Sequence, residues 1–284
     1  RALTDASIVV PAPTERVVAL CDPYDGFKRV PHFAPVVAAL LGAVGIPTLV
    51  HGARSVPPKH GYTHRVVLEA MGLDLGVGDG PESVARAAHR LAECGVAYVD
   101  LEDFCPPLHG LTPIRDSIAK RPFLATLEKL IVPIRGRMET HVVSGWVHSG
   151  YEQLMTDLIH TTGLTSSLLV KGREGHTDLR LGRDSSLWVR RAGEGNVGTN
   201  HVWASGISGT FDAEPSVGST VQLWKDILSG KSATAAELTV HLAACIWMHI
   251  DPAMNRTGAI EAIEQVLADG RAQRVFDGFC VSNG

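Results

Sequence analysis

The sequence predicts an α/β fold with a mainly parallel central sheet and helices on both faces. Short apolar runs alternate with amphipathic helical patterns over most of the chain, which is the order that parallel β-α-β units need. The apolar runs lack a polar alternation, as expected for strands that are buried on both faces. The chain has 284 residues, of which 45% are hydrophobic and 20% are charged, so it is long and apolar enough to bury such a sheet.

Taken in order, the elements begin with a strand, a helix and a parallel strand, which form one βαβ unit. Strands are predicted at 17–21, 47–50, 96–99, 140–146 and 167–170, with 187–190 as a strand in a small polar excursion. Helices are predicted at 35–44, 63–71, 81–94, 111–118, 123–131, 150–161, 219–228, 234–248 and 255–267. Glycines and serines predict a flexible connector over 191–218. We expect one α/β domain over 1–284, closed by the helices of 219–284.

Composition narrows the class of partner. The net charge is −4, so a general polyanion binder is not the first expectation and nucleic acid is a secondary one. Five cysteines without a C-x-x-C pair indicate a reduced, cytoplasmic protein. Residues 33–50 are uncharged, but Gly45 and Pro47 divide them into a buried helix and a strand rather than a membrane span. We expect no membrane partner.

The stretch VHGARSVPPKHGYTHRVVLEAMG, residues 50–72, crowds positive charge into a loop between a strand and a helix. Three interpretations remain open at this point. The charges are solvated by water, the loop is an anion site beside a helix N-terminus, or His60 and His64 bind a metal through their i,i+4 spacing. We favour the anion site, with Arg54 and Lys59 as its main contacts, because no third metal ligand is placed by the sequence.

Several motifs carry a family resemblance. The family motifs KHGNR and LEALG resemble HGAR at 51–54, PPKHG at 57–61 and LEAMG at 68–72. The motifs H-P-A-M, P-V-R and L-G-x-R-T resemble FCPPL at 104–108, PIR at 113–115 and KR at 120–121. The motif V-H-G-x-E-G-x-D-E resembles VKGREGHTD at 170–178. These are motifs of the anthranilate phosphoribosyltransferase-like group, also called glycosyltransferase family 3. The chain resembles a divergent subgroup of that family, and QLWKDILSG through the last helices resembles its closing helices.

The resemblance implies a phosphoribosyltransferase-like domain, of the kind also found in nucleoside phosphorylases, and assigns roles to residues. It implies that Arg115 and Asp178 are catalytic, that Arg115 holds the acceptor, and that Glu174 and Asp178 bind Mg²⁺. The implied phosphate- and substrate-binding residues are Asp25, Gly26, Lys28, Arg29, His51, Gly52, Arg54, Lys59, Gly61, Arg121, Lys171 and Arg173. Simpler roles stay open: Arg115 pairs with Asp116 or Glu128, and Lys171 or Arg173 neutralises Glu174. The resemblance also implies a homodimer, and we expect the family's N-terminal helical subdomain to be missing from this sequence.

Three departures from the family pattern bear on function. The Gly-rich first loop of the family is replaced by DPYDGFKR at 22–29, where Lys28 and Arg29 supply charge instead of glycine amides. Thr177 stands in the acidic pair, and Ala53 stands in place of the asparagine of the aromatic-acid pocket. We therefore expect a glycosyl or phosphoribosyl transferase that binds a phosphorylated sugar but does not use anthranilate. The alternative is a non-catalytic binder of nucleic acid or nucleotides.

Overall fold

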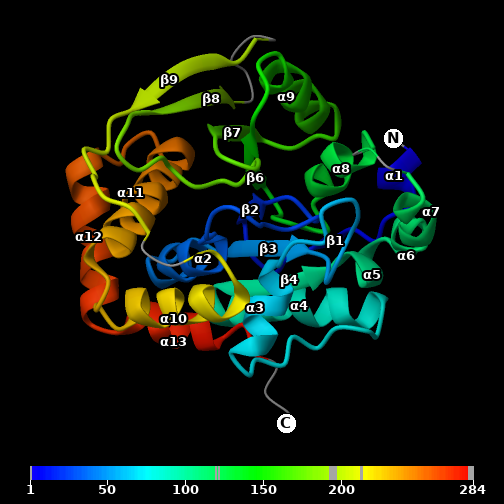
Figure 1. The fold of residues 1–284 in the computed structure, drawn as a ribbon, viewed down its shortest axis with the longest axis horizontal. Helices are drawn as coiled ribbons and strands as arrows, with labels where there is room; N and C mark the ends of the chain where they lie inside the picture. The colour runs from blue at the N-terminus through cyan, green and yellow to red at the C-terminus, as the bar shows by residue number, and fades with distance from the viewer. Residues whose placement is uncertain (1, 119, 121, 192–196, 212–213, 281–284) are drawn as a thin grey trace.

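A computed structural model describes residues 2–118, 120, 122–191, 197–211 and 214–280, built on a seven-stranded sheet (Figure 1). Five neighbouring strands of this sheet run parallel, and two antiparallel strands extend one edge. In spatial order the strands are β4 (Val96–Asp100), β3 (Thr48–Gly52), β2 (Arg16–Cys21), β6 (Glu139–Trp146), β7 (Ser166–Lys171), β8 (Ser185–Arg191) and β9 (Thr199–Trp203). Strands β1 (Val10–Pro11) and β5 (Ile134–Arg135) form a separate parallel pair. The predicted fold class is confirmed.

Helices cover both faces because successive residues of each parallel strand point to opposite sides. In β2, Val18 and Leu20 join the hydrophobic cluster on one face, and Val17 and Ala19 join the cluster on the other. The first face is covered by α2 (Ala34–Ala43), α3 (His64–Ala70), α10 (Val217–Leu228), α11 (Ala233–Ile250), α12 (Arg256–Ala268) and α13 (Arg271–Asp277). The helices α11, α12 and α13 all pack on α2, which Figure 1 shows beside the sheet.

The second face is covered mainly by α4 (Pro81–Cys94), which packs on β4, and by α9 (Tyr151–Thr161), which packs on β6 and β7 (Figure 1). The remaining elements are short: α1 (Ala2–Asp5), α5 (Leu101–Phe104), α6 (Pro106–His109), α7 (Thr112–Asp116), α8 (Leu124–Leu127) and a 3-10 turn, Glu128–Leu130. The helices predicted at 111–118 and 123–131 are therefore shorter than expected, and the second tightens into the 3-10 turn.

Three regions differ from the prediction. The segment 191–218 was expected to be a connector, but it contains β9, an edge strand paired only with β8. Four of the five residues of β9 are exposed, so the strand has no apolar run to predict it. The segment 187–190 belongs to β8 of the main sheet rather than to a separate excursion. Beyond Gly270, where the last predicted helix ends, a further helix, α13, buries Phe276.

The uncharged stretch 33–50 forms α2 and β3 in the core, as expected from Gly45 and Pro47. Among the described residues one helix, α11, has the length and hydropathy of a membrane span. Of that helix, 61% is buried inside the protein, where it packs on α2 and β7. This burial is what a core helix of an α/β fold requires.

Candidate functional site

Polar loops follow the carboxyl ends of the parallel strands and meet at one edge of the sheet, which is where ligands bind in open α/β folds. The loops after β2 and β3 are joined through their backbones: the amides of Phe27 and Tyr62 each donate to the other's carbonyl, at 3.0 and 3.1 Å. A Cβ atom on Gly61 would lie 2.5 Å from the nitrogen of Phe27. Only glycine permits this contact, so the two loops act as one rigid unit.

A carboxylate lies on the amides of the first loop. The side chain of Glu174, from the loop after β7, accepts from the amide of Arg29 at 2.8 Å and from that of Lys28 at 3.2 Å. The ammonium of Lys59 lies 3.2 Å from the same carboxylate and 3.7 Å from Asp25, and it also donates to the carbonyl of Gly26. We call the two amides together with the Lys59 ammonium the anion site. In this structure the carboxylate of Glu174 occupies the anion site.

The surroundings favour the charged form of Glu174. Burial alone would raise the pKa of this carboxyl, but the amide of Arg29, the charge of Lys59 and the amide of Lys28 lower it below its usual value. Glu174 also has a φ of 54°, which is uncommon for a residue other than glycine. Backbone strain of this kind persists where surrounding contacts fix it, and the anion site supplies those contacts.

Beneath the anion site lies a buried polar chain. Asp22 accepts at one oxygen from the amide of Thr177, at 2.8 Å, and its other oxygen lies 3.0 Å from Nε2 of His64. Nδ1 of His64 in turn lies 2.8 Å from Nδ1 of His32, and Trp224 donates to the His32 carbonyl at 2.7 Å. Burial would raise the pKa of Asp22, but the hydrogen bond and charge of His64 lower it. These buried hydrogen bonds therefore connect the loops after β2 and β7 to α3.

Sequence reasoning missed this chain. The sequence assigns no site role to Asp22 or His32, and it places His64 in the basic loop as a possible metal ligand. The available signal was weak: an aspartate directly after a strand and a histidine in the first turn of a helix. The contacts join residues 32 and 155 positions apart, and no local pattern specifies such pairings.

Acid is expected to destabilise the fold between about pH 6.5 and pH 4. Burial lowers the pKa of His176 to about 4 and that of His51 to about 3, against about 6.5 in an unfolded chain. In this window the unfolded chain binds more protons than the folded protein does. The free energy of unfolding therefore decreases as the pH is lowered, by on the order of 1 kcal/mol per pH unit for each buried histidine. Burial and the charge of Asp22 raise the pKa of Asp178. The folded protein therefore keeps a proton on Asp178 that the unfolded chain releases, and this opposes the trend. Thermal melting across pH 7 to 4 measures the slope.

The matched control for this pH dependence is His89→Gln, because His89 is an exposed residue of α4. The variant should melt with the same pH slope as the unaltered protein. A melting temperature that stays constant from pH 7 to pH 4.5 would contradict the expectation.

The basic loop divides into residues that reach the anion site and residues that do not. Lys59 lies in the site, whereas the exposed Arg54 pairs with Glu69 of α3. His60 lies 2.8 Å from Asp116, and His64 is in the buried chain, so the two histidines do not share a metal. Of the two main contacts expected here, the structure brings only Lys59 to the site.

His51 and Gly52 lie at the end of β3, below the loops. His51 is fully buried, with Nδ1 on the hydroxyl of Tyr24 and Nε2 3.2 Å from the thiol of Cys21. A Cβ atom on Gly52 would lie 3.4 Å from the hydroxyl of Tyr98. Both residues support the loops from beneath and are closed off from a ligand in this arrangement.

Arg115 takes the simpler of its two expected roles. Its guanidinium is 1% exposed and pairs with Glu128, from Nη1 to Oε2 at 2.5 Å and from Nη2 to Oε1 at 3.2 Å. Its Nη2 also donates to the carbonyl of Pro57 at 3.4 Å. A guanidinium engaged in this way is not presented to an acceptor. Arg121, the other arginine expected nearby, lies outside the described residues.

A pocket of about 440 Å³ opens beside the anion site, between the segment before α2, the loop after β7, the segment before α10 and α11. Arg29 and Arg173, both expected to bind phosphate, line it together with Arg180 and Arg183, which no motif indicated. Lys171 points elsewhere, with its ammonium 6.0 Å from the ring centre of Trp146. The remaining walls are largely apolar and include Phe33, Leu179, Leu181, Phe211 and Leu238.

The two acids that the resemblance assigns to Mg²⁺ do not share a site. Asp178 lines the pocket, and its Oδ2 lies 3.6 Å from Nδ1 of His176, which also lines the pocket. Glu174 does not line the pocket, and its oxygens are held by amides and by Lys59. No group of three or more His, Cys, Asp or Glu side chains among the described residues is arranged to hold a metal ion. With arginines around Asp178, the donor set does not fit Mg²⁺.

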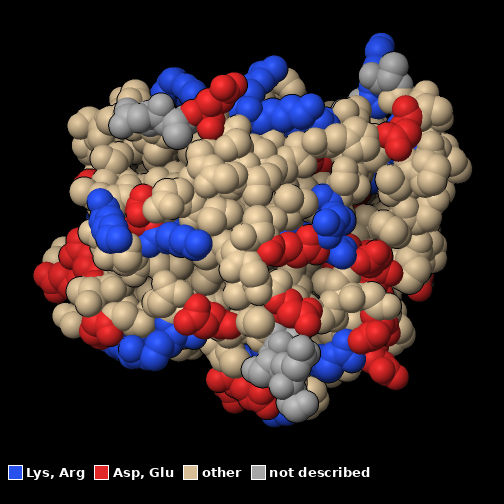
Figure 2. Space-filling view, turned by 60° about the horizontal axis from the view of Figure 1, so that its bottom comes forward, with Lys and Arg blue, Asp and Glu red and all other residues tan. Residues whose placement is uncertain are grey.

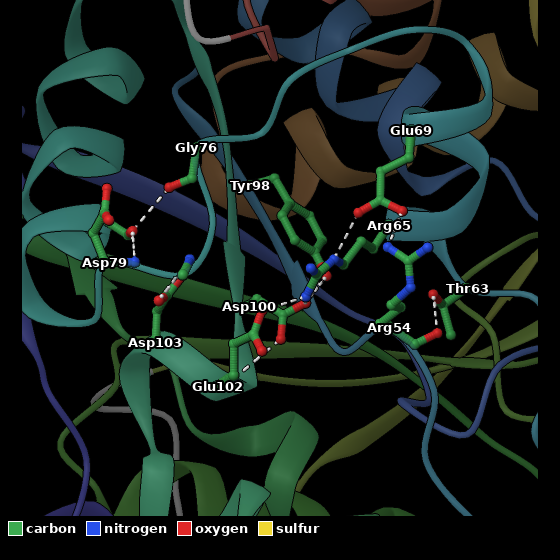
Figure 3. Close-up of polar contacts among 12 residues, drawn as sticks. Arg54, Thr63, Arg65, Glu69, Gly76, Asp79, Tyr98, Asp100, Glu102 and Asp103 are labelled. Atoms are coloured by element: carbon green, nitrogen blue, oxygen red, sulfur yellow. Dashed lines mark hydrogen bonds and ion pairs between the residues drawn. The ribbon is translucent and has the colours of Figure 1, made fainter.

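A second charged cluster supports the same edge of the sheet without facing the pocket (Figure 3). Arg65 of α3 lies 3.0 Å from Asp100 at the end of β4, 2.6 Å from Glu102 and 2.9 Å from Glu69. Asp100 also accepts from the hydroxyl of Tyr98 at 2.9 Å and caps α5 through the amide of Glu102. The cluster fixes α3 against β4, and α3 in turn carries His64 of the buried chain.

Relatives of known sequence point to one enzyme group. The chain is 26% identical over 286 residues to the anthranilate phosphoribosyltransferase of Erythrobacter litoralis (strain HTCC2594). The aligned region covers 97% of this chain and 81% of that protein. It is 25% identical over 152 residues to an uncharacterized protein of Aquifex aeolicus (strain VF5), covering 54% of this chain and 42% of that protein. The similarity to the first extends over nearly the whole chain.

Solved structures share the fold. Anthranilate phosphoribosyltransferase from Thermus thermophilus superposes with a TM-score of 0.75 at 19% identity, over 98% of this chain and 81% of that one. The Saccharomyces cerevisiae enzyme, solved in complex with PRPP and Mg, gives 0.74 at 13% identity, over 98% and 76%. The model of the glycosyl transferase family, a/b domain, matches residues 32–273, so the resemblance found in the motifs is confirmed. The chain belongs to this glycosyl transferase family and is an anthranilate phosphoribosyltransferase-like member of it.

Proposed function

We propose that the protein transfers a phosphoribosyl or related glycosyl group from a phosphorylated sugar whose phosphate binds in the anion site. The observation that carries this proposal is the Glu174 carboxylate on the amides of Lys28 and Arg29 and on the ammonium of Lys59. Backbone amides and a lysine that accept a carboxylate have the chemistry to accept a phosphate oxygen. The substrate phosphate would replace the Glu174 side chain there.

The acceptor in this proposal is not anthranilate. Ala53, which stands where the family has an asparagine, is buried and offers no hydrogen bond from its side chain. Arg115, which the resemblance assigns to the acceptor, is engaged by Glu128. A site without these two groups loses its means of holding an aromatic carboxylate, because buried arginines and amides are what orient such a group.

The proposed reaction is a displacement at the anomeric carbon of the sugar. The bond to the leaving phosphate or pyrophosphate breaks while the acceptor forms the new bond. The electron pair leaves with that group, and the proton that the acceptor loses passes to the released group or to water. Cations at the loops stabilise the negative charge that develops on the leaving group, and fixed loops orient the sugar. Asp178 lies at the boundary of the pocket, where it positions the sugar; it forms no covalent bond in this scheme.

The cell compartment and assembly state belong to the same proposal. We place the protein in the cytoplasm, in keeping with five cysteines that are all free. A homodimer remains a prediction of the resemblance. Figure 2 shows Lys and Arg interspersed with Asp and Glu on the face drawn, without a continuous basic groove there. That distribution supports a small anionic substrate over a nucleic-acid strand, and the experiment below separates the two.

Replacing Glu174 with glutamine is expected to strengthen binding of phosphoribosyl pyrophosphate about tenfold. The neutral amide no longer competes for Lys59 and the loop amides, and a single charge-assisted hydrogen bond has roughly this magnitude. Isothermal titration calorimetry on the unaltered protein and the variant measures the change. Glu264→Gln, on the exposed side of α12, removes the same charge away from the site and should bind like the unaltered protein.

Two outcomes would overturn the proposal. One is the absence of phosphoribosyl pyrophosphate binding in both proteins while single-stranded DNA binds with a steep salt dependence, as a nucleic-acid binder would. The other is weaker binding by Glu174→Gln, which would make this carboxylate a ligand of the substrate complex rather than a competitor for the site.

A further inference from the structure

Four arginines line the pocket beside the anion site, and we call this the arginine pocket: Arg29, Arg173, Arg180 and Arg183. Among the described residues none of the four forms an ion pair with an acidic side chain. Seven other described arginines do pair with acidic side chains, and Arg65 pairs with three carboxylates. Arg29, Arg173 and Arg183 are exposed and Arg180 is partly buried, so water screens much of their repulsion. The four cations still give one cavity a positive potential, which favours an anionic ligand.

Arg180 is held in position to face that ligand. Its Nε donates to the carbonyl of Lys171 at 2.8 Å, which fixes the side chain and leaves the two terminal nitrogens available. Burial and the positive charges of Arg183 and Arg173 lower the pKa of Arg180. Repulsion among the three guanidinium groups thus contributes to the shift after burial. A multiply charged anion between them would relieve their repulsion and accept paired hydrogen bonds.

Asp178 does not neutralise the arginine pocket. It is 2% exposed, its Oδ2 lies 3.6 Å from Nδ1 of His176, and the backbone of Phe33 is also in reach of the carboxyl. Burial and the neighbouring charge of Asp22 raise its pKa well above the usual value, so the neutral form is favoured. A protonated carboxyl does not repel an anion and has a hydrogen to donate to a ligand oxygen. The pocket is therefore basic despite the acid in its wall.

The arginine pocket and the anion site are neighbours. Arg29 contributes its amide to the anion site and its side chain to the pocket, and Arg173 precedes Glu174 in the chain. A phosphorylated sugar pyrophosphate has two separate anionic groups, a monophosphate and a pyrophosphate. The two adjacent sites match these groups in number, and the pocket has the greater positive charge.

We propose that the arginine pocket binds the pyrophosphate group of the sugar donor and that its arginines replace Mg²⁺ as the counter-charge. This inference rests on the proposed function, because it assigns the second anionic group of the same donor. Guanidinium groups bind phosphate oxygens in pairs without a metal, and four of them balance the charge of a pyrophosphate ester. The donor set around Asp178, which does not fit Mg²⁺, is consistent with this division of roles.

Calorimetry with inorganic pyrophosphate and with phosphoribosyl pyrophosphate tests the inference, each titrated once in EDTA and once in Mg²⁺. Both ligands should bind in EDTA, and Mg²⁺ should leave their affinity unchanged or reduce it. Arg180→Gln and Arg183→Gln should each weaken binding in EDTA roughly tenfold or more. Arg183 is an exposed residue, so that variant should keep its melting temperature. Arg271→Gln removes an exposed arginine of α13 that pairs with Asp269, and it should bind both ligands normally.

The outcomes separate this inference from the proposed function. If phosphoribosyl pyrophosphate binds only with Mg²⁺ and neither pocket variant changes its affinity, the donor assignment stands and the arginine pocket is overturned. If inorganic pyrophosphate binds in EDTA and depends on Arg180 and Arg183, while the sugar donor does not bind, the pocket is supported and the donor is wrong. If neither ligand binds under any condition, both proposals are overturned.

Discussion

Replacing Arg115 with alanine is expected to lower the free energy of unfolding by about 3–5 kcal/mol. Arg115 and Glu128 are both buried, with side chains 1% and 0% exposed, and they form a two-point ion pair. Removing the guanidinium leaves the carboxylate of Glu128 inside the protein without its main counter-charge, and desolvation of that charge dominates the cost. The loss of the hydrogen bond to the Pro57 carbonyl adds a smaller amount.

Urea unfolding monitored by circular dichroism measures this change. The matched control is Arg54→Ala, which removes an exposed arginine from its pair with Glu69 and should cost less than about 1 kcal/mol. The double variant Arg115→Met/Glu128→Leu should recover part of the loss, because an apolar pair does not leave a buried charge. A loss below about 1 kcal/mol for Arg115→Ala, together with lost acceptor binding, would return Arg115 to the role that the resemblance gave it.

The parallel part of the sheet was predictable because its strands are marked locally. Residues 17–21 and 167–170 are apolar at every or nearly every position, and burial on both faces demands that composition. The helix Pro81–Cys94 begins and ends where the sequence predicts, since its amphipathic pattern is clear and Glu82 lies in the first turn. These elements place the polar loops at one edge, which is why the loops of 22–29, 51–61 and 171–178 were expected to form the site.

The edge of the sheet was not predictable in the same way. Strand β9 (Thr199–Trp203) has one neighbour and faces solvent, so its sequence lacks both the apolar run and the alternation that indicate a strand. Pairing with β8 supplies its stability, and pairing between distant segments is a tertiary property. The connector expected over 191–218 is thus partly a strand for a reason that no local pattern contains.

The loops that form the site were predictable, but the contacts between side chains on those loops were not. Lys59 and Glu174 were both expected in the site, but as ligands of phosphate and of metal rather than as partners of each other. Arg180 and Arg183 lie beyond the matched motif and gained no role from it, although they line the pocket. Motifs place residues on loops, whereas the choice among partners on those loops depends on three-dimensional contacts.

Replacing Lys59 with methionine is expected to weaken binding of phosphoribosyl pyrophosphate about 100-fold. The Lys59 ammonium is the charged member of the anion site, and one hydrogen bond to a charged group contributes about 1.5–3 kcal/mol. Its stem lies near Phe27, with the ammonium 5.7 Å from the ring centre, so methionine preserves most of that packing. Calorimetry gives the affinity, and thermal melting shows whether the loops after β2 and β3 remain joined.

A double-mutant cycle separates the two duties of Lys59, because the lysine both attracts the ligand and neutralises Glu174. If Glu174 competes with the ligand, Lys59→Met should cost less in the background of Glu174→Gln than in the unaltered protein, since the repulsive carboxylate is gone. Lys231→Met, an exposed lysine before α11, controls for net charge and should bind normally. A change of less than about twofold for Lys59→Met in a protein that melts normally would place the phosphate elsewhere.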